Sequence, residues 1–234
     1  MLYDFDKSYI TYANIEIKMN KMRILVLLLL CFTFSYQLSA QNRLYEDPDF
    51  PAIAQEHKII AVLPFDATVS MRPKQMEGMT TEQLNKLGED EGYNIQQSMY
   101  SWFLTRKQRG EMTVEVQNPI ETNALLEKSN TGYYSLKTKT PKELAEILGV
   151  DAVIMGKFET SKPMSEGASV ALALFVGFWG NTDKAVMNMF IYNGEDGKTL
   201  FNYHRAINGS LGTNADNLIN KLMRKSSRKI AYTN

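Results

Sequence analysis

The sequence predicts an α/β fold, in which a mixed β-sheet is flanked by helices within one domain of residues 58–234. Strand-like and helix-like segments alternate along this part of the chain. Two unbroken apolar runs, Ile59–Leu63 and Ala152–Met155, are typical of strands that are covered on both faces of a sheet. Two further strand-like segments, 187–192 and 200–207, are separated by a glycine-containing turn, which predicts a hairpin.

The first 40 residues carry the pattern of a secretory signal peptide. Lys18, Lys21 and Arg23 precede an apolar run, Ile24–Phe34, and Ala40 stands as a small residue at the expected cleavage site. The alternative is an uncleaved membrane anchor, but a helix of this length covers only ~16 Å of a hydrocarbon core that is ~30 Å thick. We therefore expect the chain to be cleaved after Ala40 and exported to the periplasm or the outer membrane.

Two other residue types bear on the same N-terminal region. Met19 and Met22 stand close before the apolar run, so translation can begin at either of them. Cys31 is the single cysteine and follows Leu30, whereas the lipidated cysteine of a bacterial lipoprotein needs a small residue before it. We expect Cys31 to belong to the signal peptide, which leaves the mature chain without a disulfide or a catalytic thiolate.

The charge balance argues against a nucleic-acid partner. The sequence contains 26 basic and 26 acidic residues, so its formal net charge is zero. A neutral chain has no global field that attracts phosphate groups. We therefore expect binding to proteins or to a membrane surface, and not to nucleic acid.

The predicted domain begins after a polar segment, residues 41–57, which we expect to be an extended lead-in. Lys58–Phe65 is the first predicted strand. Pro64 ends it, because proline has no N–H to donate to a neighbouring strand. Residues 66–79 are then expected to form a polar loop.

A long helix is predicted between Thr80 and Gly110. Thr80 and Gln83 form the pattern of a capping box at its start. Gly88 and Gly92 lie in its middle, where each glycine weakens a helix by about 1 kcal/mol relative to alanine. One continuous helix and two shorter helices are therefore both compatible with this stretch.

Three shorter segments follow the long helix. Met112–Gln117 alternates and predicts a strand, and residues 120–128 have the periodicity of a short helix. Residues 129–139 are expected to form a loop. Its aromatic residues, Tyr133 and Tyr134, are candidates for exposed partner contacts.

The centre of the predicted domain is Pro141–Phe158. Thr140 and Glu143 form a second capping box, and Gly149 ends the helix because glycine takes the left-handed terminal conformation at little cost. The second apolar strand follows directly. The hairpin and a C-terminal helix with a basic end complete the domain.

Ile60–Phe65 and Leu148–Phe158 carry a resemblance to a superfamily of bacterial envelope proteins. This superfamily includes the curli secretion channel subunit, the N-terminal domain of the Tol-Pal propeller protein and the outer-membrane activators of penicillin-binding proteins. The resemblance covers residues 58–230 and agrees with a two- or three-layer sandwich similar to an anticodon-binding domain. It implies a non-enzymatic role in assembly, secretion or partner docking, and no functional residue carries over. The chain departs from the channel branch because it lacks a lipidated cysteine and two clear membrane hairpins.

No catalytic, metal or cofactor site is predicted. His57 and His204 have no acidic or histidine neighbours at metal-ligand spacing. Residues 194–199 end like a phosphate-binding loop, but they lie between two predicted strands and lack the first glycine of that motif. Asp66 and Asp151 flank strands, where a cap or turn role is expected, although a carboxylate pair is the alternative.

The uncharged segment Gly167–Gly180 lies within a predicted apolar insertion, residues 164–183. A buried insertion is the favoured interpretation. Contact with a membrane or a partner through Phe175, Phe178 and Trp179 is the second, and a pore strand is the third. The C-terminal helix has a basic end that suits a solvated face, or alternatively an anionic lipid or acidic partner.

These features together favour a non-enzymatic, exported accessory protein that docks or assembles other envelope proteins. The first alternative is a homo-oligomer that inserts Gly167–Gly180 into a membrane as a secretion channel does. The second is a hydrolase whose catalytic residues are not recognisable in the sequence. No cofactor is expected.

Overall fold

The computed structural model describes residues 43–71, 73–161, 184–208, 215–226 and 230–233. They belong to one compact unit within Gln41–Asn234. Its helices and strands are, in chain order, β1 (Arg43–Glu46), α2 (Phe50–Glu56), β2 (Ile59–Val62), β3 (Asp66–Ser70), α3 (Pro73–Met76), α4 (Thr81–Gln108), β4 (Glu115–Val116), α5 (Pro119–Lys128), the 3-10 helix η2 (Tyr133–Thr138), α6 (Pro141–Leu148), β5 (Ala152–Ser161), β6 (Lys184–Asn193), β7 (Thr199–Asn208) and α8 (Ala215–Ser226).

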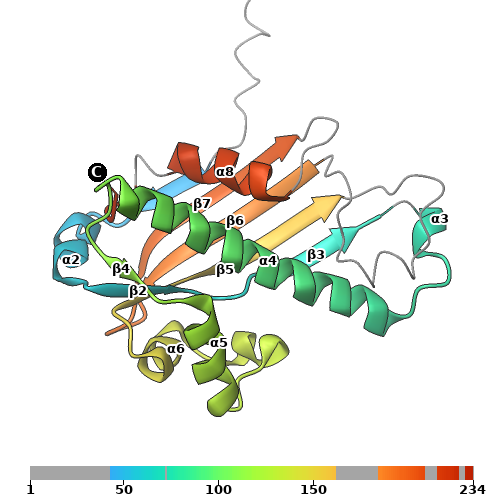
Figure 1. The fold of residues 1–234 in the computed structure, drawn as a ribbon, viewed down its shortest axis with the longest axis horizontal. Coiled ribbons are helices and arrows are strands. Elements are labelled where there is room, and N and C mark those ends of the chain that lie inside the picture. Colours follow the sequence, from blue (N-terminus) through green and yellow to red (C-terminus); the bar gives the residue numbers. More distant parts are fainter. Residues whose placement is uncertain (1–42, 72, 162–183, 209–214, 227–229, 234) are drawn as a thin grey trace, which may run out of the picture. The chain divides into compact units, whose positions relative to one another are not determined.

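A seven-stranded mixed sheet forms the middle of this unit, so the predicted fold class is confirmed (Figure 1). Its strands lie in the order β1–β7–β6–β5–β2–β4, and β3 pairs only with β5. The pairs of β5 with β2 and β3 are parallel, and those with the predicted hairpin β6–β7 are antiparallel. The hairpin is confirmed.

Strand β5 has two neighbours on one side, one after the other. Its first half pairs with β2, where Ile60 lies opposite Ala152, and its second half pairs with β3, where Asp66 lies opposite Lys157. Pro64 lies between β2 and β3, at the break that its missing N–H predicts. The chain thus returns to the same edge of β5 immediately after the proline.

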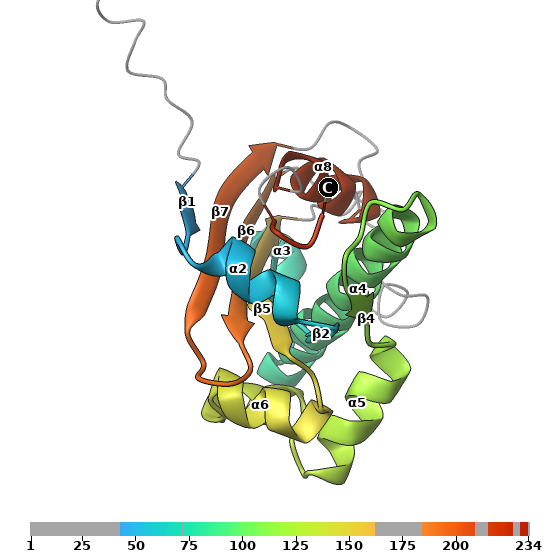
Figure 2. The same ribbon diagram turned by 90° about the vertical axis from the view of Figure 1, so that its left-hand side faces the viewer.

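Helices pack against both faces of the sheet. The larger core joins α2, α4 and α8 to the sheet through buried side chains such as Phe50, Phe103 and Ile219. A smaller core on the other face packs α5, η2 and α6 against β2 and the start of β5. Figure 2 shows α4 and α8 together on one side of the strands and α5 and α6 at the lower end.

Local sequence chemistry accounts for several boundaries. Both predicted capping boxes are present, with the Thr80 and Thr140 side chains accepting from the N–H groups of Gln83 and Glu143. Gly149 ends α6 with φ +65°, in the left-handed conformation that was expected.

The stretch with two glycines forms one helix, α4, of 28 residues. Gly88 and Gly92 lie where α4 passes closest to the strand edge. A Cβ atom at Gly92 would lie 2.2 Å from the Phe65 carbonyl oxygen, and one at Gly88 would lie 2.5 Å from that of Ala67. The glycines therefore permit close approach between helix and sheet, which outweighs their low helix propensity.

Four segments differ from the sequence-based expectation. Residues 129–139 were expected to form a loop and instead contain the 3-10 helix η2. Residues 41–57 were expected to be an extended lead-in and instead contain β1 and α2, and residues 66–79 contain β3 and α3 instead of a loop. Met112–Gln117 is reduced to the two-residue strand β4, and Met112 forms an isolated antiparallel bridge with Thr233. Residues 164–183, the predicted apolar insertion, lie outside the described residues.

Candidate functional site: a groove beside strand β3

A cavity of about 500 Å³ lies along β3, between the N-terminal half of α4 and the 3-10 helix η2. We call it the β3 groove. Its volume is within the range of pockets that bind small ligands or short segments of a partner. The residues that line it are Pro64, Asp66, Ala67, Thr68, Val69, Ser70, Met76, Leu84, Asn85, Gly88, Tyr133, Tyr134, Leu136, Lys137, Met155 and Gly156.

Tyr133 lines the β3 groove and is held by the backbone of the strand edge. Its hydroxyl donates to the Phe65 carbonyl oxygen at 2.7 Å and accepts from the Ala67 N–H at 3.0 Å. Burial raises the pKa of Tyr133 to about 12, so the hydroxyl stays neutral in the physiological range. Tyr133 is half-buried, and its role is structural.

Tyr134, the next residue, is the accessible aromatic side chain of the groove. It is 49% exposed and contacts the Tyr133 ring edge to face, with ring centroids 5.1 Å apart. Partial burial and the nearby Glu89 carboxylate raise the pKa of its hydroxyl. An exposed aromatic ring fixed by a second ring is a common contact residue in protein interfaces.

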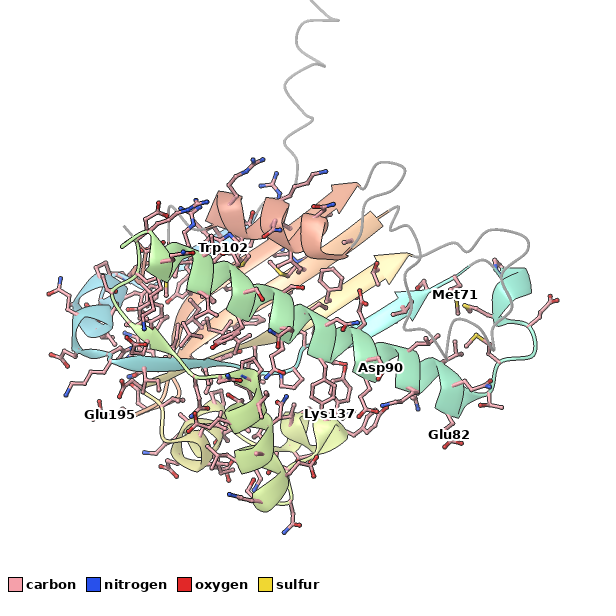
Figure 3. All side chains as sticks on the ribbon, viewed as in Figure 1. Met71, Glu82, Asp90, Trp102, Lys137 and Glu195 are labelled. Carbon is pink, nitrogen blue, oxygen red and sulfur yellow. The ribbon has the colours of Figure 1, made fainter. Side chains whose placement is uncertain are left out.

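The charged side chains of the groove do not form a catalytic arrangement. Asp66 lies 3.8 Å from Lys157, and both side chains are largely exposed. Lys137 lies on η2, and no ion pair joins it to another of the described residues. Figure 3 shows Lys137 below the middle of α4 and Glu195 at the left-hand end of the molecule. The groove therefore presents one carboxylate, one ammonium group, hydroxyl groups and main-chain atoms, and among the described residues no ion pair joins the two charged groups as an acid–base pair.

A second polar cluster, around His57, is buried and has a structural role. The His57 ring binds the Tyr232 hydroxyl through Nδ1 at 2.6 Å and the Asn193 side-chain oxygen through Nε2 at 3.2 Å. These contacts tie the C-terminal end of the chain to the start of β2 and to the end of β6. Asp151 accepts from the N–H groups that begin β2, in the cap role that was expected of it.

No metal centre or membrane-crossing helix is found in the part of the chain that the structure describes. There, no three side chains of His, Cys, Asp or Glu lie close enough to hold a metal ion. In the same residues, no helix combines the length and the apolar character that a membrane span requires.

The five residues predicted as contact sites fall into two groups. Tyr133 and Tyr134 lie together in the groove, where Tyr134 is exposed as expected and Tyr133 is mostly engaged with β3. Phe175, Phe178 and Trp179 lie outside the described residues. The groove residues of β3 and α4 were not predicted, although the alternation of Ala67 and Val69 with polar residues was a sequence indication of a strand.

Comparison with known proteins finds similar solved structures but no family. No family model matches the sequence, and no curated protein matches it. Lipoprotein GNA1162 from Neisseria meningitidis is 16% identical, with a TM-score of 0.41 over 74% of this chain and 98% of its own. The PelC dodecamer from Paraburkholderia phytofirmans is 11% identical, with a TM-score of 0.40 over 83% of this chain and 98% of its own. E. coli LpoB is 8% identical, with a TM-score of 0.35 over 69% of this chain and 65% of its own.

Structures similar to this chain thus include a bacterial lipoprotein, and the curli secretion channel is not among these three. Each TM-score is below 0.5 and each identity is below 25%. The activities and partners of these proteins are therefore not transferred to the chain.

Proposed function

We propose that the chain is a non-enzymatic accessory protein of a bacterial cell envelope, which docks a partner protein in the β3 groove. The groove itself carries the proposal. It is an accessible concavity of about 500 Å³ whose walls are fixed by the close approach of α4 to the sheet edge. Preformed concave sites of this size, with apolar walls and a few polar groups, are typical binding sites.

The chemistry of the groove favours binding over catalysis. The Tyr133 hydroxyl is hydrogen-bonded to main-chain groups of Phe65, Ala67 and Gly88, and its raised pKa makes it a poor proton donor or acceptor near neutral pH. The exposed Tyr134 ring and the Lys137 ammonium group suit contacts with a polypeptide.

The envelope location rests on the N-terminal sequence. A basic segment, an apolar run and a small residue at Ala40 are the successive parts of a signal peptide. Contact of Phe175, Phe178 and Trp179 with a membrane or a partner, and self-association, stay predictions that need their own tests.

Site-specific photo-crosslinking in the source bacterium tests the docking site. A photoreactive phenylalanine in place of Tyr134 is expected to give a defined covalent adduct with an envelope protein. The same probe in place of Glu195 provides the matched control, because Glu195 is exposed in the β6–β7 turn at the other end of β5. The proposal is refuted if the Tyr134 position gives no adduct, or if both positions give the same adducts.

A groove variant completes this experiment. Asn85 is exposed on α4 and lines the groove, so Asn85→Arg places a bulky cation there at little cost to the fold. The adduct formed at position 134 is expected to be lost in this variant while the melting temperature is unchanged. An adduct that persists would show that the crosslinked protein does not occupy the groove.

A further inference from the structure

Strands β2 and β3 both pair with β5, and their opposite edge indicates what the groove can bind. Along this edge, main-chain groups that do not face β5 meet partners from other elements. The Ile60 carbonyl oxygen accepts from the Gln117 N–H of the β4 segment at 2.8 Å, and the Val62 carbonyl oxygen accepts from the Gln96 side chain of α4 at 2.8 Å. The main-chain groups on this edge are thus hydrogen-bonded one after another, by side chains as well as by a strand.

The same closure continues past Pro64. The Phe65 N–H donates to the Gly92 carbonyl oxygen at 3.3 Å, and the Tyr133 hydroxyl bridges the Phe65 carbonyl oxygen and the Ala67 N–H. The Ala67 carbonyl oxygen then lies against Gly88, at the point where α4 passes closest.

This closure stops at Val69. In a strand, residues two apart turn their N–H and C=O groups to the same side, so the Val69 groups point to the side on which Ala67 meets Tyr133. Among the described residues, no hydrogen bond reaches the Val69 main chain from that side. Val69 lines the β3 groove instead, together with its neighbours Thr68 and Ser70.

An open strand edge is usually protected in natural proteins by proline, an inward-pointing charge, a bulge or a covering element. The part of β3 from Ala67 to Ser70 has no proline and no charge, and its pairing with β5 is regular. In this half, α4 covers the Val69 side chain, which is 8% exposed and packs with Leu87. The main-chain hydrogen bonds that Tyr133 gives to the first half have no counterpart at Val69 within the described residues.

We propose that the β3 groove binds an extended segment of a partner polypeptide, which pairs its main chain with Val69 as an added strand. This inference rests on the proposed docking function and names the chemistry of the partner. Main-chain donors and acceptors that repeat at every second residue are matched by extended backbone, which is the basis of strand addition.

Charge complementarity specifies one side chain of the partner. Asp66 is already beside Lys157, whereas Lys137 has no ion-pair partner among the described residues. Lys137 is therefore the charged side chain of the groove lining that a partner carboxylate can pair with, and Tyr134 is its exposed ring. We expect the bound segment to carry an Asp or Glu that reaches Lys137 and an apolar or aromatic side chain that contacts Tyr134.

The test uses the purified chain and a phage-displayed library of random linear heptapeptides. Peptides whose binding is lost in Asn85→Arg are kept and resynthesised with single N-methyl groups along the backbone. Strand addition predicts that N-methylation weakens binding by about tenfold or more at alternate positions only, because alternate N–H groups face β3. The kept peptides are also expected to be enriched in acidic residues and to bind Lys137→Glu at least about tenfold more weakly.

A change in the protein backbone gives a second, independent measurement. An α-hydroxy acid in place of Val69 keeps the side chain and replaces the N–H by an ester oxygen. The ester is expected to weaken binding of the same peptides by about tenfold, with an unchanged circular dichroism spectrum.

Three outcomes overturn the inference. Groove-bound peptides whose N-methyl scan lacks a two-residue period would leave docking intact and refute strand addition. A library without any binder that depends on Asn85 refutes strand addition as well. Light scattering that shows a dimer, dissociated by Asn85→Arg, would identify the occupant as a second copy of the chain. Failure of the in-cell crosslink at position 134 would instead refute the docking function.

Discussion

Replacement of Gly92 by alanine tests whether the contact between α4 and the β2–β3 edge is as close as the structure places it. Alanine is the best helix former, so Gly92→Ala would stabilise an isolated helix by about 1 kcal/mol. In the folded chain its Cβ atom would lie 2.2 Å from the Phe65 carbonyl oxygen and 2.7 Å from the Tyr133 ring. The carbonyl cannot turn aside as a flexible side chain could, so α4 must move.

The size of the effect follows from the contacts that this movement disturbs. Overpacking of this kind costs about 1–3 kcal/mol. The Phe65 N–H bond to Gly92 and the Tyr133 hydroxyl bond to Phe65 are weakened too, at about 1 kcal/mol each. With the gain in helix propensity subtracted, we expect Gly92→Ala to lower the free energy of unfolding by about 2–4 kcal/mol.

Urea unfolding followed by tryptophan fluorescence measures this loss, because Trp102 is buried on the same helix. Asn94→Ala is the matched control, since Asn94 is exposed two residues further along α4 and gains only the propensity term of about 0.5 kcal/mol. If Gly92→Ala were stabilised by as much as Asn94→Ala, the close approach of α4 to the strand edge would be disproved.

Four further predictions concern the Tyr133 and Asp47 side chains and the N-terminus of the exported protein. Tyr133→Phe is expected to cost about 1–3 kcal/mol in urea unfolding because main-chain groups of Phe65, Ala67 and Gly88 lose their partner. Tyr134→Phe should change stability by less than about 0.5 kcal/mol. The pKa of Tyr133 is raised from 10.0 to about 12, so its contribution to the free energy of unfolding is complete below pH 10 and is lost as the pH rises towards 12. Tyr133→Phe should therefore reduce the loss of stability between pH 10 and pH 12. The hydrogen bond from Lys198 lowers the pKa of Asp47. The stabilisation from this pair is therefore complete above the ordinary carboxyl pKa and is lost as the pH falls below it. Asp47→Asn should flatten the decrease of the melting temperature at acid pH. N-terminal mass spectrometry of the exported protein is expected to find Gln41 as the first residue, and a retained N-terminus would contradict the signal-peptide prediction.

The elements that sequence analysis predicted correctly depend on chemistry within a few residues. Thr140, Glu143 and Gly149 define α6 because a cap, its reciprocal partner and a left-handed glycine act within one or two turns. The apolar run at Ala152–Met155 predicts a buried central strand because four consecutive apolar residues need cover on both faces. The tertiary structure preserves these local preferences.

The elements that were missed depend on contacts that are distant in sequence. Strand β3 has only five residues, and its alternation is visible, but its stability comes from pairing with the second half of β5 about 90 residues later. Gly88 and Gly92 suggested a weak point in the helix, because glycine has a low helix propensity. Propensity cannot show that a carbonyl group of the strand edge lies against each of them. The candidate site was missed for the same reason, since its walls come from three separate parts of the chain.

The two tyrosines show how far residue type can be taken as a guide to function. Adjacent aromatic residues in a polar loop suggested partner contact, and the sequence offered no basis for treating them differently. The fold separates their roles, because the hydroxyl of Tyr133 reaches the β3 edge while the ring of Tyr134 stays 49% exposed. A loop aromatic can therefore serve as a scaffold or as a contact, and hydrogen bonding decides which.

This separation also determines which substitutions can test the function. Gly92 and Tyr133 hold the first half of the strand edge closed, so changes there alter stability and groove shape together. Asn85 and Tyr134 line the groove from exposed positions, so their side chains can be changed while the edge contacts remain. Since a loss of partner binding has meaning only in a folded chain, variants at Asn85 and Tyr134 report on docking, and variants at Gly92 and Tyr133 report on the architecture that makes docking possible.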